Sequence, residues 1–168
     1  QGAVIVAAAE LSREGVPVSY ICAGDGQERE ALEALARERG VVDRVWFPGA
    51  VSDEEKRLIY AASDVHVMPS VRVGEMIEGF GIVFLEAAAA GVPSVSGNSG
   101  GQAEAVIDNR TGLVVDGGDP EQLVAALRTL ATTVEMRREM GRQARAWADE
   151  HDWRAVRDRT LAALASIR

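Results

Sequence analysis

Two glutamates are the residues of this chain with the clearest chemical potential. Glu78 and Glu86 stand in the segment EGFGIVFLEAAAAG, which covers residues 78–91. Between Ile82 and Ala90 every residue is apolar except Glu86, so this stretch is predicted to form a helix buried on all sides. An ionised carboxylate in such surroundings is destabilising unless hydrogen-bond donors satisfy it.

Glu86 has two interpretations, and the sequence leaves both open. A structural arginine from elsewhere in the chain could pair with the carboxylate. Alternatively, Glu86 points into a cleft and accepts hydrogen bonds from ligand hydroxyls. Two adjacent ribose hydroxyls suit a carboxylate well, because its two oxygens can accept one hydrogen bond each.

Glu78 precedes the predicted helix, where its charge would compensate the positive end of the helix dipole. Gly79 and Gly81 flank Phe80 and leave the backbone bare, so N–H groups there could contact a phosphate or a sugar. Glu78 and Glu86 are eight positions apart, which corresponds to at most about 12 Å in a helix. A sugar joined through a diphosphate to a nucleoside could occupy that distance.

Short apolar segments alternate with amphipathic ones along the chain. Strands are predicted at 16–24, 44–49, 64–70, 92–97 and 111–115. Helices are predicted near 4–15, 32–40, 52–62, 82–90, 120–130, 136–149 and 152–167, with a short one within 98–106. This alternation predicts one α/β domain, a doubly wound parallel sheet with helices on both faces.

Glycines cluster where the predicted strands end. Ligands of doubly wound sheets bind beyond the carboxyl ends of the strands, so the clusters together favour a ligand cleft, although each alone is typical of any tight turn. The glycines are Gly24, Gly26, Gly49, Gly79, Gly81, Gly97, Gly100 and Gly101.

The composition excludes several classes of function. The net charge of −8 argues against broad binding to nucleic acid. The single cysteine, Cys22, excludes an internal disulfide and suits a reducing, cytoplasmic compartment. No His/Cys cluster or paired loop aspartates indicate a metal, His66 is expected in the core, and His151 is expected to cap the last helix. The sequence has no G-x-G-x-x-G after a first strand, which disfavours a dinucleotide dehydrogenase.

The segment EGFGIVFLEAAAAGVPSVSGNSGG resembles the signature of the retaining GT-B glycosyltransferases of family 4, also called group 1. Further matches in order are the Gly-Asp-Gly after a strand, VWFPGAVSDEE, ASDVHVMPS and TGLVVDGGDPEQLVAAL. The resemblance covers essentially residues 1–168 and is strongest to actinobacterial mannosyltransferases. It implies the Rossmann-like, nucleotide-sugar-binding C-terminal half of a GT-B enzyme, which transfers a sugar to an acceptor hydroxyl without metal or cofactor.

The same resemblance implies roles for individual residues. Glu86 would hold the ribose hydroxyls of the donor, and Glu78, as the catalytic residue, would hold hydroxyls of the transferred sugar. The remaining donor-binding positions would contribute mainly backbone: Gly79, Phe80, Gly81, Val51, Gly24, Gly26, Gly100 and Gly101.

The chain also departs from the family pattern. The Arg and Lys that usually neutralise the leaving diphosphate, the first strand and the N-terminal acceptor domain are expected to precede it, so the chain alone is not expected to catalyse transfer. Peripheral membrane association is left open only for the full-length protein. Two alternatives stay open: a GT-B nucleotide-sugar epimerase, for which the two histidines are poorly placed, and a non-catalytic nucleotide-binding module, against which the glutamate pair speaks.

Overall fold

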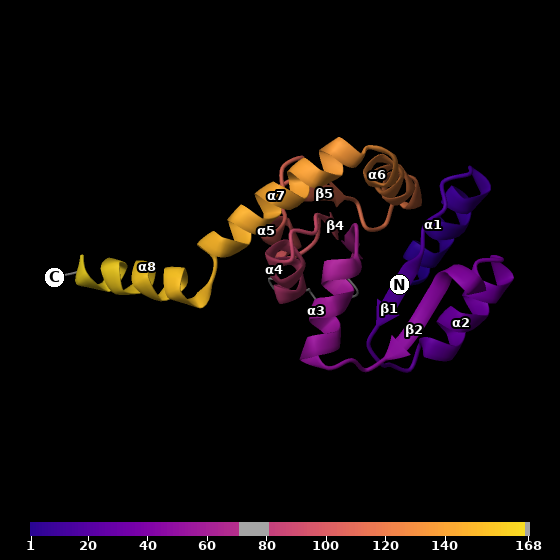
Figure 1. Cartoon of the computed structure of the whole chain (residues 1–168), viewed down its shortest axis with the longest axis horizontal. Coiled ribbons are helices and arrows are strands. Elements are labelled where there is room, and N and C mark those ends of the chain that lie inside the picture. Colours follow the sequence, from indigo (N-terminus) through magenta and orange to yellow (C-terminus); the bar gives the residue numbers. More distant parts are fainter. Residues whose placement is uncertain (71–80, 167–168) are drawn as a thin grey trace.

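The computed structural model describes residues 1–70 and 81–166, in which helices and strands alternate (Figure 1). The helices are α1 (Gly2–Arg13), α2 (Arg29–Glu38), the 3-10 helix η1 (Val42–Arg44), α3 (Asp53–Ala62), α4 (Ile82–Ala89), α5 (Gln102–Ala105), α6 (Pro120–Thr132), α7 (Val134–Glu150) and α8 (Trp153–Ala165). The strands are β1 (Tyr20–Ala23), β2 (Val45–Gly49), β3 (His66–Met68), β4 (Ser94–Gly97) and β5 (Gly112–Val115).

The described strands are all paired in parallel, as predicted, but in two ladders. One ladder joins β1 to β2, and the other has the order β3-β4-β5. Within the described ranges β1 and β3 are not hydrogen-bonded to each other, so the predicted single sheet consists of two separate ladders. They nevertheless share one core, because Tyr20 of β1 and Val67 of β3 pack against the same buried cluster.

Helices cover both faces of the β3-β4-β5 ladder. Val115 packs in a cluster with Leu123 of α6, whereas its neighbour Val114 packs against Phe84 of α4. Successive residues of a strand point to opposite faces, so α6 and α4 lie on opposite sides of the ladder. The predicted α/β class with two-sided cover is therefore confirmed.

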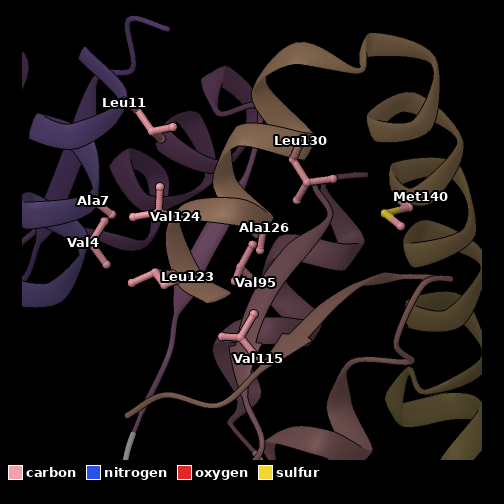
Figure 2. Packing of buried hydrophobic residues seen from close by; sticks show 10 residues of the cluster. All are labelled: Val4, Ala7, Leu11, Val95, Val115, Leu123, Val124, Ala126, Leu130 and Met140. Carbon is pink, nitrogen blue, oxygen red and sulfur yellow. The ribbon is translucent and has the colours of Figure 1, made fainter. Parts of the chain in front are cut away.

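The larger core lies between α1, α6 and the strands (Figure 2). Side chains of α1 face those of α6, the strand residues Val95 and Val115 lie beside α6, and Met140 of α7 lies at the edge of the cluster (Figure 2). The buried members are Val4, Ala7, Leu11, Val95, Val115, Leu123, Val124, Ala126, Leu130 and Met140. This packing holds the strands whose carboxyl ends carry the glycine turns.

Strand β1 is shorter than predicted. The sequence pattern suggested residues 16–24, but the strand covers Tyr20–Ala23. The backbone N–H of Val16 donates instead to the carbonyl of Leu11, at 2.9 Å, and so completes the end of α1. Pro17 follows with no N–H of its own, so the segment before Tyr20 serves as a helix-to-strand turn.

Helix α4 begins at a glycine that no other residue could easily replace. Gly81 caps the helix in the left-handed region with φ of 71°. A Cβ atom at that position would lie 2.7 Å from Cδ2 of Phe84, whose ring is fully buried. The close contact and the positive φ both require glycine, and together they set where α4 starts.

Helix α4 packs against α7 through small residues. Ala88 of α4 is buried against Ala144 and Ala148 of α7. A Cβ atom on Gly141 would lie 2.2 Å from the carbonyl oxygen of Gly91, so the two backbones are in direct contact. In addition, Arg145 of α7 donates to the carbonyl of Ala89 at the end of α4. Helix α7 therefore fixes the C-terminal end of α4.

Helix α8 extends away from the rest of the chain (Figure 1). Asp152 caps it by accepting a hydrogen bond from the N–H of Ala155 at 2.7 Å. None of its described residues is buried, and Trp153 is 86% exposed. The helix is thus set by its own cap and by contact with α7. His151 ends α7 rather than starting α8, and its Nδ1 lies 2.8 Å from the carbonyl of Trp147.

His66 occupies the half-buried space between β3, α3 and α4, as the sequence predicts for a packed residue. Its ring lies edge-on to those of Tyr60 and Phe84, with centroids 5.8 and 5.2 Å away. Its Nδ1 is 3.2 Å from Oγ of Ser94. Removal from water lowers the pKa of His66 from 6.5 to about 4, so the ring is neutral at pH 7.

Replacing Gly141 with alanine is expected to destabilise the protein. The added methyl group would overlap the carbonyl oxygen of Gly91 and force α7 away from α4, which should cost about 1–3 kcal/mol of unfolding free energy. Urea denaturation measures this loss. Gly2→Ala is the matched control, since its Cβ would meet Leu35 Cδ2 and Leu32 Cδ2 at ordinary distances of 3.6 and 3.9 Å. Equal stability of G141A and wild type would contradict the close backbone approach.

His66 is expected to make the protein acid-sensitive. Between pH 6.5 and about 4 the unfolded chain binds a proton at this ring that the folded chain does not, so stability falls as the pH drops through this window. The loss should reach about 2 kcal/mol, which is less than the full shift because the ring is only half-buried. Urea midpoints of wild type and His66→Gln at pH 7 and pH 4.5 test it. His151→Gln is the control, and an acid loss undiminished in H66Q would refute the assignment.

Candidate functional site

The carboxylate of Glu86 lies between α4 and α3. Its Oε1 accepts a hydrogen bond from Nζ of Lys56 at 2.7 Å, and its Oε2 accepts one from the hydroxyl of Tyr60 at 3.4 Å. The Tyr60 hydroxyl is also 3.4 Å from the carbonyl oxygen of Val83. The Glu86 side chain is 29% exposed, so it is not sealed from solvent. Each of its oxygens thus has a donor within reach from the chain itself: a close one from Lys56, and a weaker one from Tyr60, whose single proton is shared with the Val83 carbonyl.

Helix α3 presents Lys56 and Tyr60 on one face because they are four residues apart. The helix begins with the predicted capping box: Oγ of Ser52 accepts from the N–H of Glu55, and the Glu55 carboxylate accepts from the N–H of Ser52 at 2.8 Å. Asp53 lies 3.4 Å from the Lys56 ammonium on the same helix. The cap therefore fixes the turn from which Lys56 reaches α4.

Lys56 and Tyr60 have defined protonation states at neutral pH. The hydrogen bond to Glu86 raises the pKa of Lys56 above its ordinary value, so Lys56 stays an ammonium. Burial, followed by the nearby charge of Glu86, raises the pKa of Tyr60 to about 12. Tyr60 is therefore a neutral hydroxyl that donates, and it does not act as a base.

The two interpretations of Glu86 can now be compared with its surroundings. A cationic partner exists, as the structural interpretation requires, but it is a lysine rather than an arginine. The ligand interpretation also stands, because a carboxylate offers about four lone-pair sites and the two donors occupy one on each oxygen. The role of Glu86 in holding ribose remains a prediction.

The glycine turn at the start of α4 is described only in part. Glu78, Gly79 and Phe80 lie outside the described residues. Gly81 is the N-cap of α4, and from it the backbone continues into the helix that carries Glu86. The predicted backbone contacts of the turn, like the catalytic role of Glu78, remain predictions.

Gly24 and Gly26 lie beyond the carboxyl end of β1, as the ligand-cleft hypothesis requires. Gly24 has φ of 123°, a conformation that favours glycine. Both line a cavity of about 180 Å³ at the start of α2, together with Arg29 and Phe47. The Arg29 guanidinium is bonded to Glu33 at 3.0 Å and to the Phe47 carbonyl at 2.9 Å, so it braces α2 against β2.

Val51 and the Gly100-Gly101 pair occupy two other strand-to-helix turns. Val51 is half-buried between β2 and the capping box of α3, nine residues before Tyr60. Gly100 has φ of 66°, and Gly101 is the N-cap of the short helix α5. Val51, Gly100 and Gly101 therefore each lie in a turn after a strand, and their contacts with a donor remain predictions.

Three polar residues of the site were not predicted from the sequence. Lys56 and Tyr60 of α3 contact Glu86, and the only sequence signal for them was their four-residue spacing. Gln102 is fully buried; its amide accepts from the N–H of Gly97 at 3.3 Å and donates to the Ser99 carbonyl at 3.1 Å. It thereby closes the turn after β4.

The turns after β3 and β4 are in direct contact. A Cβ atom on Gly97 would lie 2.4 Å from the carbonyl oxygen of Ser70, and Oγ of Ser99 donates to that same oxygen at 3.0 Å. The backbone of the β4 turn therefore rests on the end of β3. This contact places the glycine-rich segment 97–101 beside the strand that precedes the glutamate signature.

Over residues 1–70 and 81–166 no group of three or more acidic, histidine or cysteine side chains is arranged to hold a metal ion. Among the helices in the same ranges, none combines the length and apolar character that a membrane span requires.

Comparison with known proteins places this geometry in a family context. Residues 2–147 match the family model described as glycosyl transferases group 1. The GDP-mannose-dependent alpha-(1-6)-phosphatidylinositol monomannoside mannosyltransferase of Mycobacterium tuberculosis is 38% identical over 156 residues, which are 92% of this chain and 40% of the relative. The chain thus spans less than half the length of this curated relative.

Solved structures agree with the sequence match. Anabaena HepE, solved in complex with UDP, superposes with a TM-score of 0.84 at 25% identity, over 99% of this chain and 45% of HepE. The C-terminal domain of a Francisella tularensis group 1 glycosyl transferase, LpcC, superposes with a TM-score of 0.73 over 86% of this chain and 75% of that domain. At 21% identity the second match shows the fold alone. The fold, the order of the glycine turns and the match over most of its length together show that this chain belongs to the group 1 glycosyl transferase family.

Proposed function

We propose that this chain binds the nucleotide-diphosphate sugar of a retaining glycosyl transfer reaction. The observation that carries the proposal is the carboxylate of Glu86, which Lys56 of α3 holds at 2.7 Å while 29% of the Glu86 side chain stays exposed. A carboxylate so arranged suits the two hydroxyls of a ribose ring. Two relatives support the donor class: HepE was solved with UDP, and the mycobacterial relative is named as GDP-mannose-dependent.

The proposed division of labour follows the chain. Glu86 accepts the ribose hydroxyls, and Val51 meets the base with its backbone. The glycine turns at Gly24, Gly26, Gly100 and Gly101 let the chain approach the nucleotide closely. Glu78 binds hydroxyls of the transferred sugar, and the amides of Gly79, Phe80 and Gly81 contact that sugar or the diphosphate.

In the proposed reaction, the bond between the sugar and the diphosphate breaks and the anomeric carbon gains oxocarbenium character. The acceptor hydroxyl attacks from the face that the diphosphate leaves and gives its proton to the departing diphosphate oxygen, and attack from this face retains the configuration. Glu78 positions the sugar and stabilises the positive charge, and basic side chains and helix amides, rather than a metal, stabilise the diphosphate. We place the acceptor site in a part of the protein outside this chain, since the relatives are much longer. We place the reaction in the cytoplasm, where one unpaired cysteine is stable.

Glu86→Ala is expected to weaken the binding of UDP or GDP at least about tenfold, because the ribose hydroxyls lose a charged acceptor. Isothermal titration calorimetry on the full-length protein measures this affinity. Glu86→Gln keeps the shape and removes the charge, so it should show most of the same loss. The control is Glu54→Ala, at an exposed position of α3. An E86A protein that binds as tightly as wild type would refute the ribose assignment.

Glu78→Gln is expected to lower the rate of sugar transfer at least about a hundredfold in the full-length protein, since the positive charge on the sugar loses its carboxylate. Binding of the bare nucleotide diphosphate, which lacks the sugar, should change by less than about twofold. Transfer assays and calorimetry on the same preparation separate the two effects. A normal transfer rate in E78Q would remove Glu78 from the proposed mechanism.

A further inference from the structure

Lys56 stands beside the carboxylate that the proposed function assigns to ribose. We infer that Lys56 is a positioning residue of the donor site, which orients Glu86 for the ribose hydroxyls and so favours ribonucleotides over 2′-deoxyribonucleotides. The inference rests on the proposed function and adds to it a residue and a selectivity. Lys56 acts through Glu86 and need not itself touch the donor.

The first step is the geometry of the two donors. Nζ of Lys56 binds Oε1 of Glu86 at 2.7 Å, and the Tyr60 hydroxyl binds Oε2 at 3.4 Å. Because the donors approach different oxygens, they restrain both the position of the carboxylate and the rotation of its plane, Tyr60 only weakly because its single proton is shared with the Val83 carbonyl at the same 3.4 Å. Lys56 supplies the shorter and the charged contact, so it contributes more of this restraint than Tyr60 does.

The second step is the hydrogen-bonding capacity that remains. A carboxylate has about four lone-pair sites, and Lys56 and Tyr60 occupy one on each oxygen. One site per oxygen is therefore left. Two vicinal hydroxyls of ribose can fill these two sites, whereas a 2′-deoxyribose fills only one.

The third step is the rigidity of the lysine itself. Its ammonium also lies 3.4 Å from the Asp53 carboxylate, one turn earlier on α3. The Ser52–Glu55 capping box fixes that turn, and the Lys56 side chain is only 36% exposed. Lys56 is thus held before any ligand arrives, and a carboxylate that is already oriented loses less conformational entropy on binding.

A lysine in a nucleotide site could instead bind a phosphate group, and the two roles predict different losses. A phosphate contact would weaken ribonucleotides and 2′-deoxyribonucleotides equally when the lysine is removed. Orientation of Glu86 toward two hydroxyls predicts a larger loss for the ribonucleotide. A purely structural role would change stability and leave the ratio of the two affinities unchanged.

The test is calorimetric titration of the full-length protein with UDP, GDP and their 2′-deoxy forms. For whichever base binds, Lys56→Met should weaken the ribonucleotide about tenfold and its 2′-deoxy form less than about twofold. Lys56→Arg, which keeps the charge, should restore ribonucleotide affinity to within about threefold of wild type. Arg57→Met is the matched control on the next position of α3, an exposed cation that makes no ion pair within the described ranges, and it should change neither affinity. Thermal melting of each variant verifies folding.

The outcomes separate the inference from the proposed function. Equal losses for both nucleotide forms in K56M, or no loss while Glu86→Ala still weakens binding, would overturn the role of Lys56 and leave the proposed function standing. If K56M does not fold, K56R decides: an arginine variant that loses the ribonucleotide and the 2′-deoxy form equally overturns the inference. If wild type binds none of the nucleotides, or Glu86→Ala has no effect, the proposed function fails and the inference fails with it.

Discussion

The fixed position of helix α4 is the constraint on which the rest of the site depends. Its start is fixed by Gly81 against Phe84, and its end by the contact between Gly91 and Gly141. A helix held at both ends keeps its single carboxylate directed toward α3, where 29% of the Glu86 side chain is exposed. Since an unsatisfied charge in that position would be destabilising, a neighbouring element has to provide donors, and α3 provides them through Lys56 and Tyr60.

The position of α3 then follows from its own start. The capping box satisfies the first N–H groups of the helix and fixes the turn that carries Asp53 and Lys56. Tyr60, one turn later, packs edge-on to His66 of β3, and His66 packs on Phe84 of α4. The aromatic contacts and the ion pair thus join α3, β3 and α4 into one unit, with the polar contact at its more exposed end.

Much of this arrangement could be read from the sequence, and the remainder could not for identifiable reasons. The lone glutamate in an apolar run predicted that Glu86 needs a partner, and Ser52 with Glu55 predicted the start of α3. The prediction that α4 is buried on all sides was wrong: Phe84, Ala87 and Ala88 are buried, but Ile82 is 67% exposed, because one face of the helix packs on no other described element. The identity of the partner could not be predicted, because Lys56 lies 30 residues from Glu86 in the chain, within DEEKR, a run typical of a solvated helix face. Gln102 gave no signal, since burial of an amide depends on carbonyl and N–H groups that only the folded turn brings together. The division of the strands into two ladders also depends on spacing in three dimensions rather than on residue pattern.

A satisfied glutamate and a ligand-binding glutamate are usually treated as alternatives, but the chemistry of the carboxylate allows both. A site that relied on its ligand for every hydrogen bond would leave α4 with an uncompensated charge whenever the ligand is absent. One that used all lone pairs internally would have nothing left to offer. Glu86 lies between these limits: each oxygen has one donor from α3, and 29% of the side chain is exposed. The ion pair therefore compensates the charge of Glu86 in the empty state, and in the proposed function the same contacts orient the carboxylate for two ribose hydroxyls.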